Sequence, residues 1–180
     1  ISFTGVSKTL DGAATLATGG TRTFGDASGD SFTFNGGLTT SSVVGTVTLN
    51  TSISSSDDAL TFGAITLGNN VTIDTNATNT ATGDITIGAV TGGNNTLTLT
   101  TENNIANADI TATGAIAGVT TLTLASVGGT ATLSADVDVT TLSVDNTVAN
   151  VAFTGNGSSV TNAISFSNDG PLTLGTSGGK

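Results

Sequence analysis

The chain consists of short segments in which apolar and polar residues alternate strictly. Each segment reads apolar, polar, apolar, and the polar position is most often Thr or Ser. This period of two residues is typical of a half-buried β-strand, with its apolar side chains facing the core. No segment shows the periodicity of an amphipathic helix. The predicted strands lie at residues 32–34, 47–49, 60–62, 65–67, 71–73, 85–87, 96–99, 110–112, 121–124, 137–139, 141–144, 151–153, 164–166 and 172–174.

Clusters of Gly and Asn separate these segments. They lie at residues 68–70, 92–95, 128–129 and 155–157. Gly adopts positive φ angles at no steric cost and Asn tolerates them, so such clusters favour tight turns. We therefore predict that each cluster forms a corner between two short strands.

Two motifs recur at the same spacing. The residues at 84–87 return at 109–112, and the Thr-Leu-Thr-Leu motif at 96–99 returns at 121–124, both after 25 residues. A looser copy of the second motif follows at 141–144, only 20 residues later. A repeat of 20–50 residues is typical of solenoid proteins, and loops of variable length can absorb a drifting period.

These patterns predict an all-β protein that folds as a parallel β-helix, or β-solenoid, with rungs of roughly 20–25 residues. Residues 1–180 are expected to form a single solenoid domain of about eight rungs, on the order of 40 Å long at the usual strand spacing. A β-sandwich would also give closely spaced short strands, but it would not explain the double recurrence at 25 residues. Neither end shows a capping helix or a charged edge strand. We therefore expect a segment of a longer repetitive chain, or a protomer that stacks on its neighbours.

The composition supports a β-rich extracellular protein. About one residue in five is Thr, charged residues make up 9%, and Cys, His, Met, Trp and Tyr are all absent. A mean hydropathy of +0.25 argues against disorder. Because Lys and Arg total only 3 and the net charge is −10, we expect no binding to nucleic acid, whose phosphates need cationic partners. No apolar run approaches the roughly 20 residues of a transmembrane helix, so we expect no membrane insertion.

The residues for catalysis are largely missing. Without His or Cys, neither a Ser-His nor a Cys-His pair can activate a nucleophile. The close carboxylate pairs are Asp57 with Asp58 and Asp136 with Asp138, and neither has the cations or large aromatic side chains that a polysaccharide-cleaving solenoid would use. We therefore predict that the protein is not an enzyme and has no organic cofactor.

Calcium is the one ligand that the acidic residues suggest. Calcium binds several oxygen ligands, and Asp57, Asp58, Asp136 and Asp138 are the candidates for supplying them. The glycine-rich nonapeptide that binds calcium in other solenoids does not occur here. The alternative is that these carboxylates are solvated and keep the rod in solution.

Thr-x-Thr units offer another binding hypothesis. They occur at 46–48, 96–98, 111–113 and 121–123, and stacked on one flat face they would form a surface suited to ice. The change in period from 25 to 20 residues argues against constant spacing of these units. The alternative is that Thr is simply a favourable outward residue in a strand.

The Thr-, Gly- and Asn-rich strands, such as those at 83–88 and 118–124, resemble the β-strand repeats of giant bacterial surface proteins. Filamentous-haemagglutinin-like exoproteins and autotransporter passenger domains belong to that group. The resemblance implies a right-handed parallel β-helix, export from a bacterium, and a role in adhesion or in a matrix or sheath. Residues 1–180 do not include that group's amino-terminal secretion cap or carboxy-terminal membrane barrel, so the resemblance does not extend to an export route.

Together, these observations lead us to expect a structural component of an extracellular or cell-surface bacterial fibre, sheath or filament, with an adhesive role as a further expectation. Its expected partner is itself, through end-to-end or lateral association, with host or matrix glycans as additional partners. The alternative function is a ligand-binding solenoid that recognises ice through a Thr ladder or glycans as an adhesin module.

Overall fold

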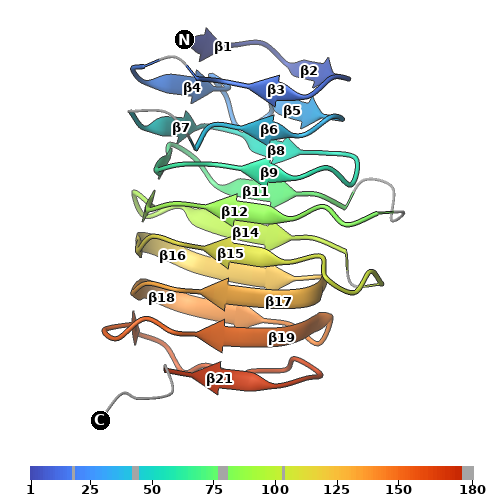
Figure 1. Ribbon diagram of the computed structural model, residues 1–180. Coiled ribbons are helices and arrows are strands. Elements are labelled where there is room, and N and C mark those ends of the chain that lie inside the picture. The colour runs from blue at the N-terminus through green and yellow to red at the C-terminus, as the bar shows by residue number, and fades with distance from the viewer. Residues whose placement is uncertain (18, 42–44, 77–80, 103, 176–180) are drawn as a thin grey trace.

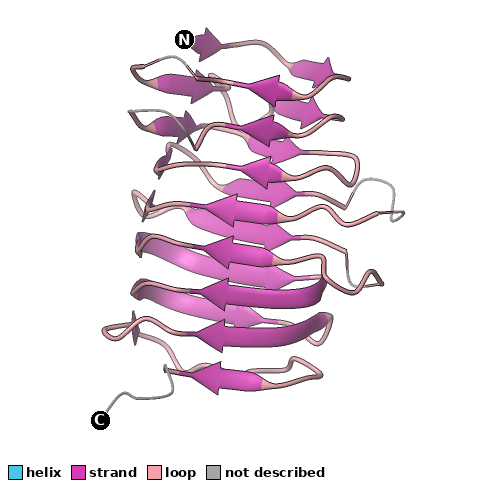
Figure 2. Ribbon diagram, viewed as in Figure 1, coloured by secondary structure: helices cyan, strands magenta, loops and turns pink. Residues whose placement is uncertain are grey.

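The computed structural model describes residues 1–17, 19–41, 45–76, 81–102 and 104–175. Within these ranges the molecule is a stack of β-strands with no helix (Figures 1 and 2). Figure 1 shows successive strands running in layers from the N-terminus at one end of the stack to the C-terminus at the other. Named strands form one 13-stranded and one 8-stranded sheet, and every pairing between them is parallel. The predicted parallel β-solenoid is therefore confirmed, while its right-handedness stays a prediction.

Each turn of the solenoid contributes to three faces. The 13-stranded sheet forms the first and second faces, and the 8-stranded sheet forms the third, which gives eight turns. The first face contains β1 (Ser2–Phe3), β4 (Arg22–Phe24), β7 (Val47–Leu49), β10 (Ile65–Leu67), β13 (Val90–Thr91) and β20 (Ser159–Val160). The second face contains β2 (Ser7–Leu10), β5 (Ser31–Phe34), β8 (Ser52–Ser54), β11 (Val71–Asp74) and β14 (Thr96–Thr100). The long strands β16 (Ile116–Ala125) and β18 (Val137–Val144) run through both of these faces. The third face contains β3 (Ala14–Thr15), β6 (Leu38–Thr39), β9 (Leu60–Thr61), β12 (Ile85–Ile87), β15 (Ile110–Ala112), β17 (Val127–Leu133), β19 (Val148–Phe153) and β21 (Leu172–Leu174).

The repeat in the sequence corresponds to the register of the parallel strand pairs. Ile85 pairs with Ile110, and Thr96 pairs with Thr121, so both 25-residue recurrences place equivalent residues side by side. Elsewhere the offset between paired residues is shorter, as between Leu122 and Leu142. The connections between strands absorb the difference in length, and the strands themselves stay aligned.

Alternation along each strand builds a continuous core. In β14, for example, Leu97 and Leu99 are fully buried, while the three threonines that alternate with them are half-buried on the outside. Leu97 and Leu99 stack on Leu122 and Leu124 of the next turn. Near the N-terminal end the column is aromatic, and the Phe24 ring stacks on Phe3 at 4.9 Å between ring centroids.

Most of the predicted corners and strands are confirmed, with two corrections. At the corner 92–95, Gly93 and Asn94 have φ angles of 58° and 65°, as the Gly-Asn pattern predicted. The pair 128–129 is not a corner but lies inside β17, where the register shifts after Val127. A Cβ atom on Gly128 would lie 2.3 Å from the carbonyl oxygen of Glu102, so close approach of the backbone explains this glycine. The segment 164–166 is not a strand, and Phe166 forms a single bridge to Val144.

A core substitution in the middle of the stack should be costly. Leu97→Ala removes a fully buried side chain between two neighbouring turns, so we expect a loss of about 2–5 kcal/mol in the free energy of unfolding. The matched control on the same strand, Thr98→Ala, changes an outward side chain and should cost less than about 1 kcal/mol. Urea unfolding followed by circular dichroism measures both, and equal costs would contradict the described core.

Candidate functional site

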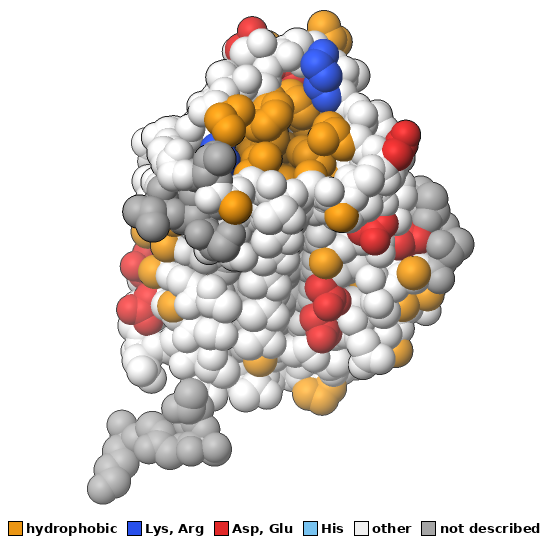
Figure 3. Space-filling view, turned by 45° about the horizontal axis from the view of Figure 1, so that its top comes forward, with side chains coloured by type: hydrophobic (Ala, Val, Ile, Leu, Met, Phe, Trp, Pro, Cys, Tyr) orange, Lys and Arg blue, Asp and Glu red, His pale blue; other side chains and the backbone are white. Residues whose placement is uncertain are grey.

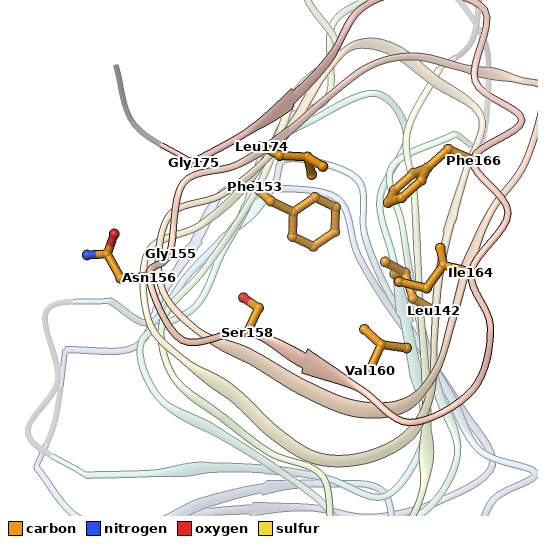
Figure 4. Close-up of a pocket in the computed structure, with 10 residues that line it drawn as sticks. All are labelled: Leu142, Phe153, Gly155, Asn156, Ser158, Val160, Ile164, Phe166, Leu174 and Gly175. Carbon is orange, nitrogen blue, oxygen red and sulfur yellow. The ribbon is translucent and has the colours of Figure 1, made fainter. Parts of the chain in front are cut away.

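The C-terminal end of the stack exposes the apolar core. A cavity of about 360 Å³ opens there, and Figure 4 shows apolar side chains pointing toward one another across it. These side chains come from all three faces, because Leu142 and Val160 face Phe153 and Leu174 across the last turns. Leu174 is 67% exposed although its strand continues the third face. The cavity is therefore the uncovered end of the core column. Its lining consists of Leu142, Phe153, Gly155, Asn156, Ser158, Val160, Ile164, Phe166, Leu174 and Gly175.

The N-terminal end is open in the same way. Figure 3 shows apolar side chains gathered on this end of the stack, with a basic side chain beside them. Val6 is 75% exposed, and Leu10 is also exposed. Phe3, Ala14 and Leu16 pack on the core but are only partly buried. Strands β1, β2 and β3 each have a paired strand on one side only, so three strand edges lie free around this apolar patch.

The outer side of the third face carries a rank of threonines in register. Thr39 pairs with Thr61, Thr61 with Thr86, Thr86 with Thr111, and Thr111 with Thr132. The drift in sequence period does not disturb this rank, because the connections take up the extra residues. The predicted Thr-x-Thr units do not share one face, since 46–48 lies at the first face, 96–98 and 121–123 pair on the second, and 111–113 begins in the third.

Several acidic side chains hold one turn of the solenoid to the next. The carboxylate of Asp84 accepts the N–H of Asp109 at 3.0 Å, and that of Asp109 accepts the N–H of Thr130 at 2.7 Å. Asp30 closes a local turn instead, and the N–H groups of Asp26 and Ala27 lower its pKa. These carboxylates accept hydrogen bonds from backbone N–H groups and so stabilise the fold.

The four calcium candidates lie in two separate places. Asp57 and Asp58 follow β8 in the third turn, where Asp57 is buried and has a φ angle of 64°. Asp136 precedes β18 and accepts the N–H of Gly157 at 2.7 Å, and Asp138 points to solvent from β18. The structure thus keeps the two pairs of aspartates apart. Across the described ranges, no three His, Cys, Asp or Glu side chains lie close enough to hold a metal ion together.

A buried carboxylate that the sequence analysis overlooked lies at the corner between the second and third faces. Glu102, the one glutamate in the chain, is fully buried after β14, and neither of its carboxylate oxygens has a hydrogen-bond partner. The amide oxygen of Asn76, which follows β11 one turn earlier, is also buried without a partner. Burial raises the pKa of Glu102, and the charges of Asp57 and Asp74 raise it further. No local sequence pattern marks this site, because Asn76 and the carboxyl groups that act on Glu102 belong to other turns.

No protein-family model matches the chain, and no curated protein or solved structure matches it either. The assignment of the fold therefore rests on the strand pairing alone, and the resemblance to bacterial surface proteins remains a prediction. In the described ranges no helix has the length and apolarity to cross a membrane.

The stability of the protein in a chelating buffer should depend on Glu102. The pKa of Glu102 is raised above its ordinary value of 4.5 in the folded state, so its contribution to stability is fully present below about pH 4.5. That contribution is lost as the pH rises through the raised folded-state pKa. We expect Glu102→Gln to remove this loss, so that its thermal midpoint falls less than the wild-type midpoint between pH 4.5 and 8.

The control for this experiment is Asp138→Asn, which changes an exposed carboxylate. Burial raises the pKa of Asp74 as well, and its effect is common to all three proteins. Parallel pH profiles for wild type and Glu102→Gln would contradict the buried ionisable state of Glu102.

Proposed function

We propose that the protein is a structural rod of an extracellular bacterial fibre, sheath or surface filament, that it associates end to end with copies of itself, and that it has no catalytic activity. The observation that carries this proposal is the pair of apolar ends, where a further turn, of a longer chain or of another copy, can continue the parallel ladders. The N-terminal end presents the free edges of β1, β2 and β3 beside the partly buried Phe3, Ala14 and Leu16. The C-terminal end presents the free edges of β20 and β21 beside the exposed Leu174.

The two ends are complementary in direction. The first turn lacks partners on one side of its strands and the last turn lacks them on the other side. A second copy can place its first turn against the last turn of its neighbour and continue the ladders of the first and third faces without reversing a strand. On the second face the last turn contributes only the bridge from Phe166 to Val144. Such a head-to-tail contact uses two different surfaces, so it does not close on itself and gives an open filament. Exposed strand edges are the feature by which sheets pair with other chains.

Composition supports the extracellular setting. A rod with 9% charged residues and a net charge of −10 offers few Lys or Arg sites for proteases, and its outward threonines keep the sheet surface hydrated. The adhesive role, the right-handed twist and the bacterial surface location rest on the resemblance of the strands to surface-protein repeats. Glycans are the partners that this adhesive role implies.

Electron microscopy at several concentrations tests end-to-end association. We expect wild-type protein to form uniform filaments about one solenoid wide, because open ladders and apolar ends are covered together. Leu174→Lys puts a charge on the exposed C-terminal end and should abolish the filaments without unfolding the chain.

The matched control is Thr132→Lys, which places the same charge on the outer side of the third face. Filaments of this variant should look like wild type. Discrete short rods of the wild type at every concentration would overturn self-association, and loss of filaments only in Thr132→Lys would mean lateral packing.

The rank of threonines favours a second candidate function, in which the third face recognises ice or an ordered glycan surface. Five threonines, from Thr39 to Thr132, lie in register on consecutive turns. Adjacent turns are about 4.8 Å apart in a sheet of this kind, so the rank presents hydroxyl and methyl groups at a regular interval.

Inhibition of ice recrystallisation tests this second candidate. We expect wild-type protein to slow recrystallisation and Thr111→Lys, in the middle of the rank, to lose most of that activity. Thr23→Lys makes the same change on the first face and should keep it. Absence of activity in the wild type would exclude ice, and a glycan-binding screen with the same three proteins would then decide the glycan version.

A further inference from the structure

Three buried oxygen atoms at one corner of the solenoid lack any hydrogen-bond donor. They are the two carboxylate oxygens of Glu102 and the amide oxygen of Asn76. All three are acceptors, and Glu102 is fully buried. Buried polar groups are nearly always satisfied, so orphan acceptors at one place indicate a positively polarised ligand that the protein is built to hold.

The fold places these oxygens on consecutive turns. Asp74 pairs with Thr100 at the ends of β11 and β14, and Asn76 and Glu102 each follow two residues later. The intervening Thr75 and Thr101 are buried, and their hydroxyl groups donate to the carbonyl oxygens of Gly83 and Ala108 at 2.6 and 3.1 Å. These bonds fix the backbone from which both side chains leave.

Among the described residues, the corner gathers carboxyl groups and no basic side chain. Asp57 lies one residue beyond Ser56, which bridges to Asn76, and the charges of Asp57 and Asp74 both act on Glu102. Two cationic side chains fall in the described ranges, Lys8 and Arg22, and both belong to the first two turns. Neither lies in the third, fourth or fifth turn, which hold this corner. The carboxylate of Glu102 therefore has no nearby cation in this part of the protein.

We propose that Glu102 and Asn76 bind a calcium ion at this corner, with Asp57 and Asp74 adding negative charge around it. Calcium accepts six to eight oxygen ligands in flexible geometry, including a bidentate carboxylate and an amide oxygen, and backbone carbonyls and water can complete the shell. Zinc, copper and nickel favour imidazole or thiolate ligands, which the chain lacks. The site does not require three carboxylates in one cluster, which the described residues do not form.

This inference is independent of end-to-end association, because the corner lies in the middle turns and not at an end. The site also differs from the sequence-predicted calcium residues, since it shares only Asp57 with them. An ion here would join the fourth and fifth turns through Asn76 and Glu102, with Asp57 of the third turn adding charge.

Calcium titration of dispersed protein, monitored by thermal unfolding and calorimetry, tests the site. We expect the wild-type midpoint to rise with calcium and to return on addition of a chelator, with one ion bound per chain. Glu102→Gln keeps the shape of the side chain but removes its charge, so we expect calcium affinity to fall about tenfold or more. Asp138→Asn, the exposed control, should bind calcium like wild type.

Asn76→Ala provides a second test that does not depend on the carboxylate, and it should also weaken calcium binding. A wild-type midpoint that calcium does not change would overturn the proposal and leave Glu102 as a buried protonated acid. An equal calcium response in wild type, Glu102→Gln and Asn76→Ala would also overturn it, because the ions would then bind the exposed acidic residues.

Discussion

The structure depends on one constraint, which is that each turn can bury its apolar side chains only between the turn before it and the turn after it. Parallel backbone pairing keeps the turns in register, and the alternation in each strand then places apolar side chains in the core. A slip of one residue would turn a whole strand's apolar set toward solvent, so register and core specify each other. The outward threonines and the aspartates that accept N–H groups from the next turn follow from the same alignment.

The same constraint explains what is exceptional in the molecule. The ends are apolar because a turn without a neighbour cannot hide its core face, as the cavity around Phe153 and Leu174 shows (Figure 4). Glu102 is exceptional in the opposite sense, since it places a carboxylate inside a corner where the neighbouring turns supply acceptors and no donors. The apolar ends and the buried corner at Glu102 are separate features in separate parts of the rod.

The sequence predicted the strand pairing well, because in a solenoid the spacing of a sequence repeat equals the offset between paired residues of neighbouring turns. Ile85 and Ile110 repeat in the sequence, and they pair in space. Local patterns were less informative where tertiary contacts decide the structure. Gly128 was interpreted as a turn residue, but it permits the approach of the backbone at Glu102. The apolar alternation at 164–166 forms no strand, and Phe166 makes only a single bridge to Val144. Glu102 could not be identified as a site from its neighbours in sequence, since the oxygens around it come from other turns.

The variable connections have a consequence for the dimensions of the rod. The offset between paired residues is 25 from Ile85 to Ile110 and 20 from Leu122 to Leu142, yet both steps advance the stack by one strand spacing. Residues gained or lost in a connection therefore change the girth of one turn and leave the length of the rod unchanged. The length of the rod is therefore set by the number of turns. Insertions or deletions at the corners leave that length unchanged.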